Sequence, residues 1–530
     1  MTTKTAEHYS YDELPYIGRS YQQTHPDQLA AVARLHGMTP APVERCRVLE
    51  LACCDGTNLL PMAYTLPQST FLGVDFAAGP LVAGRQRAEA LGLRNIRLEA
   101  QDLLDFPADA GEFDYIIAHG FYSWVPEAVR EKIMAVCGAH LSPQGVVYLS
   151  FNAYPGYHVR ELQRNLMLYH LAHVDAATPA EQANHALEAM NFVAASQPED
   201  HPCRGMLSEA HDYYREEVEK SPTGLAWFCH DLLEAHNVPA YFHQVAAHAV
   251  RHGLQFLSDV HLRAPRAMGF PPDTVRILES MDSDPVAQDQ YTDFILCAPF
   301  RQVTFCRADV RLDRTLGPAR MKDLHVAGNI TLAPAPIDDP NGASGIKGKE
   351  VETFICNSGK ISVAHPAAKA TLRRIGAAWP HGVSFADLEA GQAGHGTSQE
   401  LADFLLRLSV GKMANFRARE IAWPLTPGDR PEASAEARSA AEAGSLVTTL
   451  YHGRVQLQPS LRFLLGLLDG TRDRAQLAAA MRRWIESGQA AQAGGGTSES
   501  GDEAPLSLQD LDTGLEGTLQ TMCKLGLLVR

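Results

Sequence analysis

Between residues 46 and 155, short apolar segments alternate with longer amphipathic ones, and this alternation constrains the fold more than any other feature. The apolar segments are CRVLEL, TFLGVDF, IRLEAQD, FDYIIAHG and GVVYLSFN, and those between them include NLLPMAYTL, PLVAGRQRAEALGL and WVPEAVREKIMAVCGAHL. Short apolar runs bounded by turn residues indicate buried strands, whereas the intervening segments have the length and pattern of helices. Repeated strand–helix units predict an α/β fold with a Rossmann-like, doubly wound parallel sheet.

The rest of the chain predicts further domains, since at about 100–200 residues per domain a chain of 530 residues holds three or four. Beyond the sheet we expect helices at Glu161–His173, Pro179–Ala195, Glu209–Lys220 and Ala240–Leu257, and a strand within FILCAPFRQVTFCR. After residue 345 the order helix, helix, strand-like tail is typical of a winged helix. The expected parts are an N-terminal segment at 1–45, the sheet domain at 46–155, a mainly helical domain at 156–330, and winged-helix-like modules at 345–430 and 446–530.

Two polar stretches in the C-terminal half are expected to lie outside these modules. Residues 430–445, RPEASAEARSAAEAGS, are expected to form a linker between the two modules. Residues 487–505, SGQAAQAGGGTSESGDEAP, have the low-complexity composition of a flexible insert.

Charge and composition exclude several classes of partner. The formal net charge of -16 makes the chain a poor non-specific binder of nucleic acid, because phosphate binding requires an excess of Lys and Arg. No run of 18 uncharged apolar residues occurs, so we expect no membrane span, and MTTKTAEHYSYDELPY lacks the apolar core of a signal peptide. The ten cysteines form no Cys-x-x-Cys pair, which favours free thiols in a cytoplasmic protein. A homodimer is left open.

The loop after the first predicted strand is the best candidate for a ligand site. The strand Arg47–Leu51 carries Glu50 and runs into Ala52-Cys53-Cys54-Asp55-Gly56 before the next helix begins. Small residues at 52, 54 and 56 let a ligand approach the backbone closely. The helix N-terminus that follows offers N–H groups and a partial positive charge. This arrangement suits the carboxylate of a methionine-like ligand.

Three further strand ends fit the remainder of such a ligand. Asp75 ends the second strand, 19 residues after Gly56, where a carboxylate can accept from ribose hydroxyls. After the third strand, Asp102 suits an adenine amino group while Leu103 donates its backbone N–H. The fourth strand opens at His119-Gly120, beside the reacting end. A dinucleotide fits less well, because its pyrophosphate requires Gly-x-Gly-x-x-Gly and positions 52 and 54 are Ala and Cys.

These segments carry a family resemblance. LELACCDGTNLLPMA, FLGVDF, NIRLEAQDLLDF, FDYIIAHGFYSWVP and SFNAYPGYH resemble the class I methyltransferases with a methyltransferase regulatory domain, including bacterial protein lysine methyltransferases that act on outer-membrane proteins. SYDELPYIGRSYQQTHPDQL upstream, and CHDLLEAHNVPAYFHQVAAHAVRHGLQFLSD and FRQVTFCR downstream, extend the resemblance. Where the family's loop begins Glu-Leu-Gly-Cys, this chain has Ala52, and Cys54 stands where Gly or Ala is usual. These side chains narrow the space for the cofactor's methionine end.

The resemblance implies an enzyme that uses S-adenosylmethionine (SAM) to methylate a protein side chain, with lysine as the expected acceptor. It also implies that residues 1–45 form a lid over the cofactor, although an ordinary helix start capped at Thr24, with Pro26 in the first turn, explains that segment equally well. The residues assigned to the cofactor are Tyr16, Thr24, Glu50, Ala52, Cys54, Gly56, Asn58, Asp75, Phe76, Asp102, Leu103 and His119.

Methyl transfer from a sulfonium requires a well-placed neutral nucleophile. Burial and aromatic walls help a lysine to lose its proton, and aromatic faces stabilise the sulfonium. Candidates for this role follow the fourth and fifth strands: His119, Tyr122, Trp124, Asn152 and Tyr154, with Tyr157 nearby. Packing explains Trp124 and Tyr157 equally well.

Other signals are set aside, and two other functions stay open. The histidines at 230, 236, 243, 248, 252 and 261 suggest a metal, but the chain has no His-Glu-x-x-His motif and no acidic partner in register, so we expect no metal. The same fold would also serve a small-molecule methyltransferase. A degenerate cofactor loop would instead fit a non-catalytic scaffold.

Overall fold

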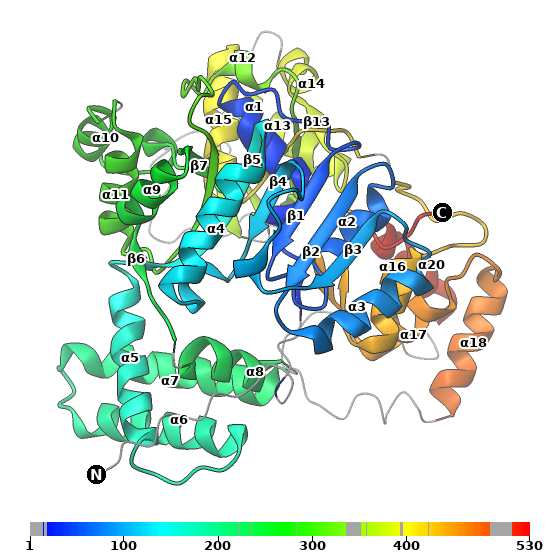
Figure 1. Cartoon of the computed structure of the whole chain (residues 1–530). Coiled ribbons are helices and arrows are strands. Elements are labelled where there is room, and N and C mark those ends of the chain that lie inside the picture. The colour runs from blue at the N-terminus through cyan, green and yellow to red at the C-terminus, as the bar shows by residue number, and fades with distance from the viewer. Residues whose placement is uncertain are drawn as a thin grey trace.

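An eight-stranded sheet organises the molecule in the computed structural model, which describes residue 14 and residues 18–530 apart from 222, 235, 282, 335–350, 357, 393–395, 422 and 488–510. The strand order is β3-β2-β1-β4-β5-β8-β7, and β6 pairs with β5 (Figure 1). The expected α/β, Rossmann-like fold is therefore confirmed. None of the described helices combines the length and the apolar character needed to cross a membrane.

The first five strands run parallel and alternate with helices, as the sequence predicts. The strands are β1 (Arg47–Leu51), β2 (Thr70–Asp75), β3 (Ile96–Ala100), β4 (Phe113–Ala118) and β5 (Leu141–Tyr154). The helices are α1 (Pro26–Leu35) before the sheet, then α2 (Leu59–Thr65), α3 (Ala78–Ala90) and α4 (Glu127–His140). The central strand β1 is fully buried at Val48, Leu49 and Leu51, so the apolar runs lie in the core.

The sheet is completed by strands from much later in the chain. β8 (Phe300–Arg307) pairs antiparallel with β5, and β7 (Leu254–Asp259) pairs antiparallel with β8. The helix predicted at Ala240–Leu257 extends too far: α9 covers Phe242–Arg251, and the chain then turns at Gly253, with φ 74°, into β7. FILCAPFRQVTFCR likewise divides between the end of α11 (Pro285–Leu296) and β8.

The segment between β5 and β6 (Ala240–Tyr241) forms a helical group that stands apart from the sheet at the lower left of Figure 1. Its helices are α5 (Tyr157–Leu171), α6 (Pro179–Ser196), α7 (Pro202–Lys220) and α8 (Gly224–Phe228). They share a core of their own that includes Met167, Met190, Leu207 and Phe228. The short α10 (Pro272–Glu279) comes before α11 and packs against it, at the left edge of Figure 1.

Residues 318–417 pack beside the sheet and share its core with α1. The helices are α12 (Pro318–Met321), α13 (Pro366–Ala378), α14 (Phe385–Ala390) and α15 (Ser398–Val410). One small sheet joins β9 (His325–Ala327), β13 (Val383–Ser384) and β14 (Asn415–Arg417), and another joins β10 (Thr331–Leu332), β11 (Glu352–Cys356) and β12 (Gly359–Val363).

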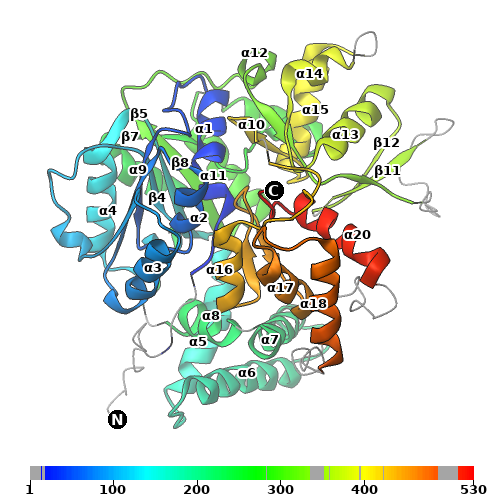
Figure 2. The same cartoon turned by 90° about the vertical axis from the view of Figure 1, so that its right-hand side faces the viewer.

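The last part of the chain has a separate core. It contains α16 (Ala435–Ala443), the hairpin β15 (Leu446–Thr448) and β16 (Arg454–Gln456), then α17 (Pro459–Leu467), α18 (Arg474–Glu486) and α20 (Leu511–Lys524). The linker expected at 430–445 is wrong, because α16 lies there, capped by the Ser434 side chain and placed beside α2 (Figure 2). The expected flexible insert falls almost wholly outside the described residues.

Candidate functional site

The loop between β1 and α2 bends sharply at alternate residues. Ala52, Cys54 and Gly56 all adopt left-handed backbone conformations, with φ of 59°, 53° and 76°. Glycine adopts this conformation freely, whereas a residue with a β-carbon pays about 1–2 kcal/mol. Ala52 and Cys54 are therefore strained, and strain of this kind is typical of ligand sites. The small residues singled out in the sequence are those at which the loop turns.

Asp75 fastens this loop to the end of β2. Its Oδ2 accepts from the Cys54 N–H at 2.8 Å, and its Oδ1 accepts from the Ala77 N–H at 2.9 Å. Burial raises the pKa of Asp75 above its ordinary value. Each carboxylate oxygen can accept a second hydrogen bond, so the capacity for ribose hydroxyls remains. The next residue, Phe76, has 79% of its surface exposed and offers a flat apolar face beside that carboxylate.

At the end of β3, the Asp102 side chain bonds within its own turn, which the sequence does not predict. Asp102 precedes the short turn Leu103–Asp105 and accepts from the Leu104 N–H at 2.9 Å. The side chain of Leu103 is buried. Asp102 therefore stabilises its own turn, and only its remaining acceptor capacity is left for an adenine amino group.

Asn58 connects three distant parts of the chain. Its side-chain NH₂ donates to Glu50 Oε1 at 2.8 Å and to Thr24 Oγ1 at 3.0 Å. Its Oδ1 accepts from the Tyr21 N–H and lies 2.9 Å from His452 Nε2, from the C-terminal hairpin. The side chain thus joins β1, the N-terminal segment and the last domain.

Glu50 is the most unusual group of the site. It is buried, and its Oε2 has no hydrogen-bond partner in the described structure. Burial raises the pKa of Glu50 from its ordinary value of 4.5 to about 8, although the bond from Asn58 opposes this rise. A buried acceptor without a donor is costly. A ligand that brings a donor, such as an ammonium group, would satisfy it.

Residues 21–25, before α1, lie against these residues. The Tyr21 and His119 rings have centroids 3.7 Å apart, and Gln23 bonds to the Tyr148 hydroxyl. The helix start expected at Thr24 is wrong by one residue: the cap of α1 is His25, whose Nδ1 accepts from the Asp27 N–H. Thr24 is fully buried against Asn58 instead. Tyr16 lies outside the described residues.

His119 sits at the end of β4, where the sequence analysis puts the reacting end. Its Nδ1 lies 2.9 Å from the Tyr148 hydroxyl, and the Phe300 ring meets it edge-on at 6.3 Å. Burial, together with the charge of Arg454, lowers the pKa of His119 to about 3. The imidazole is therefore neutral at physiological pH and does not repel a sulfonium.

Tyr154 belongs to an aromatic cluster at the end of β5. Its ring stacks on His158 at 4.0 Å and lies 5.3 Å from Tyr241, and its hydroxyl donates to Glu161 Oε1 at 3.0 Å. Burial raises the pKa of Tyr154 to about 12, so the phenol keeps its proton. His158 and Glu161 remain partly exposed. The cluster is therefore an aromatic surface with a carboxylate that reaches solvent.

The other three acceptor-site candidates have structural partners. Tyr122 is buried and its hydroxyl lies 2.8 Å from His248 Nδ1, so it points toward α9 rather than toward the loop. Asn152 is also buried; its backbone N–H donates to Ser123 Oγ and its side chain donates to Asn237 Oδ1. Trp124 ends a short 3-10 turn (Tyr122–Trp124) and is half-buried.

Sequence reasoning did not identify the contribution of the C-terminal domain. Besides His452, the Arg454 guanidinium lies 5.7 Å from the centre of the Tyr21 ring, and Thr448 bonds to Ser20 at 3.0 Å. No local pattern marks Thr448 and Arg454, because their partners Ser20 and Tyr21 lie more than 400 positions away in the chain.

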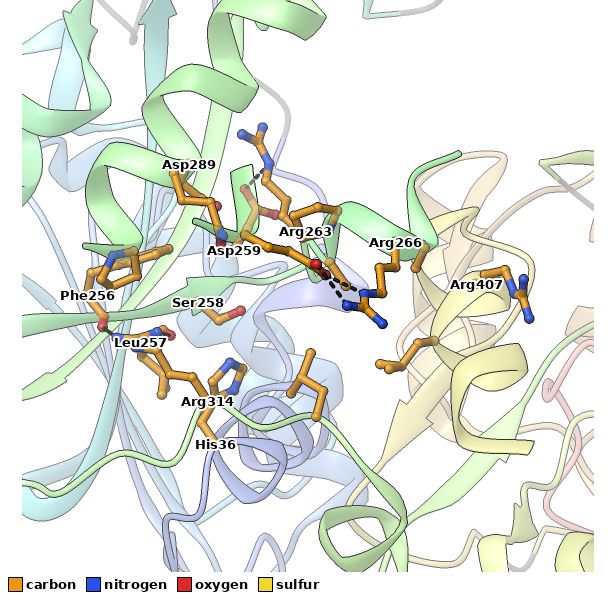
Figure 3. Close-up of a pocket in the computed structure, with 18 of the residues that line it drawn as sticks. His36, Phe256, Leu257, Ser258, Asp259, Arg263, Arg266, Asp289, Arg314 and Arg407 are labelled. Carbon is orange, nitrogen blue, oxygen red and sulfur yellow. Dashed lines mark hydrogen bonds and ion pairs between the residues drawn. The ribbon is translucent and has the colours of Figure 1, made fainter. Parts of the chain in front are cut away.

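A cavity of about 400 Å³ lies away from the strand ends, bordered by β7, α11 and α15 (Figure 3). Many of its lining groups are charged but neutralised in pairs: Arg263 bonds to Asp293 at 2.6 Å, and Arg266 pairs with Glu279. The lining contains none of the residues assigned to the cofactor. This cavity is therefore separate from the candidate site.

A sheet whose first five strands run parallel, closed by an antiparallel strand and with the candidate site at the ends of β1, β2 and β4, is typical of the class I methyltransferases. Comparison with known families agrees. Residues 48–145 match the model of a methyltransferase domain, residues 226–307 that of a predicted methyltransferase regulatory domain, and residues 429–527 that of the PKMT C-terminal winged helix domain. The chain belongs to the SAM-dependent methyltransferases that combine these three domains.

Individual relatives support the same assignment. The uncharacterized protein RP789 of Rickettsia prowazekii is 30% identical over 508 residues, which cover 92% of this chain and 88% of the relative. RP028 of the same organism is 32% identical over 236 residues, 44% of this chain and 91% of that protein. The structure of PKMT2 from Rickettsia typhi in complex with AdoHcy has a TM-score of 0.81 at 23% identity, covering 97% of this chain and all of that one, so the fold is shared throughout.

Proposed function

We propose that this methyltransferase methylates lysine side chains of proteins, holding SAM across the carboxyl ends of β1, β2 and β4. SAM supplies a methyl group already activated on a sulfonium. The residues at these strand ends fit its parts. Glu50 Oε2 is a buried acceptor that lacks a donor, as the methionine ammonium would provide, Asp75 retains acceptor capacity for the ribose, and Phe76 offers a flat face for the adenine. The related PKMT2 from Rickettsia typhi holds AdoHcy, the demethylated product.

The observation that carries the choice of acceptor is the partly exposed aromatic cluster at the end of β5. Tyr154, His158 and Tyr241 provide ring faces, and Glu161 provides a carboxylate. Phe300 pairs with Asn152 two residues before Tyr154 and contacts His119, so the aromatic surface continues to the cofactor end. Aromatic faces with one carboxylate attract an ammonium, and an open surface admits a side chain of a protein. A closed pocket would instead favour a small metabolite.

The chain's own residues would then position the reactants. Neutral His119 lines the reacting end without adding positive charge near the sulfonium. The ring faces and the Glu161 carboxylate would hold the incoming lysine as an ammonium, which must then release its proton to solvent before the nitrogen can attack the methyl group. The N-terminal segment, held by Asn58 and stacked on His119 through Tyr21, would close the site from water as a lid.

The test is to incubate the full-length protein with methyl-labelled SAM and protein fractions and to locate the label by mass spectrometry. We expect label on lysine. Label confined to small molecules would overturn the protein acceptor. Calorimetry with SAM and its demethylated product tests the cofactor site separately, and failure of both to bind at millimolar concentration would support a scaffold.

Asp75→Ala gives that binding test its residue-level control. Loss of two charge-assisted hydrogen bonds should weaken cofactor binding by about 100-fold or more. Asp109→Ala, which removes an exposed carboxylate in the loop before β4, should bind normally. Equal affinities for both variants would contradict the assignment of the ribose to Asp75.

A further inference from the structure

One side-chain cluster takes no part in the site described above. Glu131 lies on α4, His248 in the last turn of α9, and His252 directly after that helix. His248 Nε2 lies 2.9 Å from Glu131 Oε2, and His252 Nε2 lies 2.8 Å from Glu131 Oε1. One ligand atom from each residue fits within 4.8 Å of the others. No metal is expected from the sequence, because the helix itself carries no acidic partner in register, but the structure supplies that partner from α4.

The packing around the cluster fixes its geometry. A β-carbon at Gly138 on α4 would lie 2.1 Å from the His252 carbonyl oxygen, so the two helices approach as closely as a glycine allows. The Tyr122 hydroxyl lies 2.8 Å from His248 Nδ1. A hydrogen bond at that nitrogen leaves Nε2 as the nitrogen directed at Glu131, and metal-binding histidines are commonly oriented in this way.

We propose that Glu131, His248 and His252 bind a divalent transition-metal ion, Zn²⁺ foremost, with water completing a tetrahedral shell. Two imidazole nitrogens and one carboxylate oxygen are ligands that Zn²⁺ favours, and sites with three protein ligands keep a fourth position for water. Ligand atoms around Zn²⁺ lie about 3.3 Å apart, because each is about 2.0 Å from the ion. The distances of 2.9 and 2.8 Å from the Glu131 oxygens to His248 Nε2 and His252 Nε2 therefore need to widen by only about half an ångström.

Access and charge agree with this assignment. The Glu131 side chain is 53% exposed, so an ion can enter from solvent, whereas the two histidine side chains are largely buried. The nearby cation, Arg251, lies 3.8 Å from Glu131 Oε2 and is itself exposed, so it can move away.

The ion would join α4, between two strands of the methyltransferase half, to α9, within the regulatory match at 226–307. It would therefore stabilise the contact between these parts, independently of methyl transfer. Without a metal, the same three side chains would form only a hydrogen-bonded pair of histidines on one carboxylate.

The experiment uses the full-length protein freed of metal with a chelator and titrated with Zn²⁺, with bound metal measured by atomic absorption and calorimetry. We expect wild type to bind one ion per chain more than His252→Ala or Glu131→Gln. The control His185→Ala breaks an exposed His–Glu pair on α6 and should match wild type. Tyr122→Phe should keep the site but weaken its affinity about 10–100-fold.

Co²⁺ provides a readout that a purely structural role would not give. A tetrahedral site should produce intense visible absorption with wild type and His185→Ala, and this absorption should be absent with Glu131→Gln. Circular dichroism of the metal-free proteins shows whether each variant folds. If His252→Ala does not fold, Glu131→Gln, which changes an exposed side chain, still tests the site. Equal stoichiometry and equal Co²⁺ spectra in wild type and Glu131→Gln would overturn the proposal.

Discussion

The Glu50 carboxyl group should make the stability of the cofactor-free protein depend on pH. Its pKa is about 8 in the folded protein because burial disfavours the carboxylate, whereas its ordinary value is 4.5. The folded state therefore holds this proton more tightly than the unfolded state does. At a pH below 4.5 the carboxyl group is protonated in both states and does not reduce the stability of the folded protein. As the pH rises from there toward 8, the free energy of unfolding falls by about 1.4 kcal/mol per pH unit.

Glu50→Gln removes this titration while keeping an oxygen that can accept from Asn58. Between about pH 5.5 and pH 8, the free energy of unfolding of the variant relative to wild type should increase by about 3 kcal/mol. Urea unfolding across that range measures the difference. Glu89→Gln, at an exposed position on α3, provides the control and should show a difference that does not change with pH.

Two results would refute this reasoning. A Glu50→Gln difference that stays constant within about 0.5 kcal/mol over the range would mean that the carboxyl group is not held in its neutral form by burial. If saturating cofactor left the pH trend of wild type unchanged, the ammonium group would not be the missing partner of Glu50, because a nearby positive charge must favour the carboxylate.

Three further predictions concern the framework of the site. Asn58→Leu should lower the free energy of unfolding by at least about 3 kcal/mol, because three groups each lose a hydrogen-bond partner at about 1 kcal/mol or more. A loss below about 1 kcal/mol in urea unfolding would contradict the role of Asn58 in joining these parts of the chain. Arg301→Met should lower the free energy of unfolding by about 3–5 kcal/mol, because the fully buried guanidinium contacts three buried carboxylates. Arg276→Met, which breaks an exposed ion pair, should lower it by less than about 1 kcal/mol. Equal losses of stability in the two variants would contradict the role of burial. Gly138→Ala should lower the free energy of unfolding by about 1–3 kcal/mol, and with it the melting temperature, because the added methyl group clashes with the backbone of His252 at the end of α9. Gly205→Ala, on an open helix surface, should leave stability unchanged or raise it. A larger loss of stability in Gly205→Ala than in Gly138→Ala would contradict the close contact of the helices.

The sequence predicts the first half of the sheet well because each signal there is local. The strands around Arg47–Leu51 and Phe113–Ala118 are short apolar runs, and the helices between them carry their own turn signals. The four strand ends follow from that pattern, so Asp75 and His119 could be placed at one edge of the sheet from their position in the chain alone.

The failures occur where distant contacts decide the structure. Leu254–Asp259 has a pattern that continues the preceding helix, and pairing with β8 makes it a strand. Ala435–Ala443 has the composition of a linker, yet it forms a helix whose buried Glu436 pairs with Arg87 at 3.2 Å. Glu131 and His452 likewise act on residues more than 100 positions away, so no local spacing could have revealed them.

The late arrival of β7 and β8 has a consequence for synthesis on the ribosome. β5 spans 14 residues and is apolar through most of its length, and the strand that covers its free edge is not translated until residue 307. About 150 residues must be added in between, which at about 5–20 residues per second takes on the order of 10–30 s. During that interval the nascent chain presents an open strand edge, the surface through which chains pair wrongly with one another. We expect the newly made protein to depend on a chaperone until its regulatory segment has emerged.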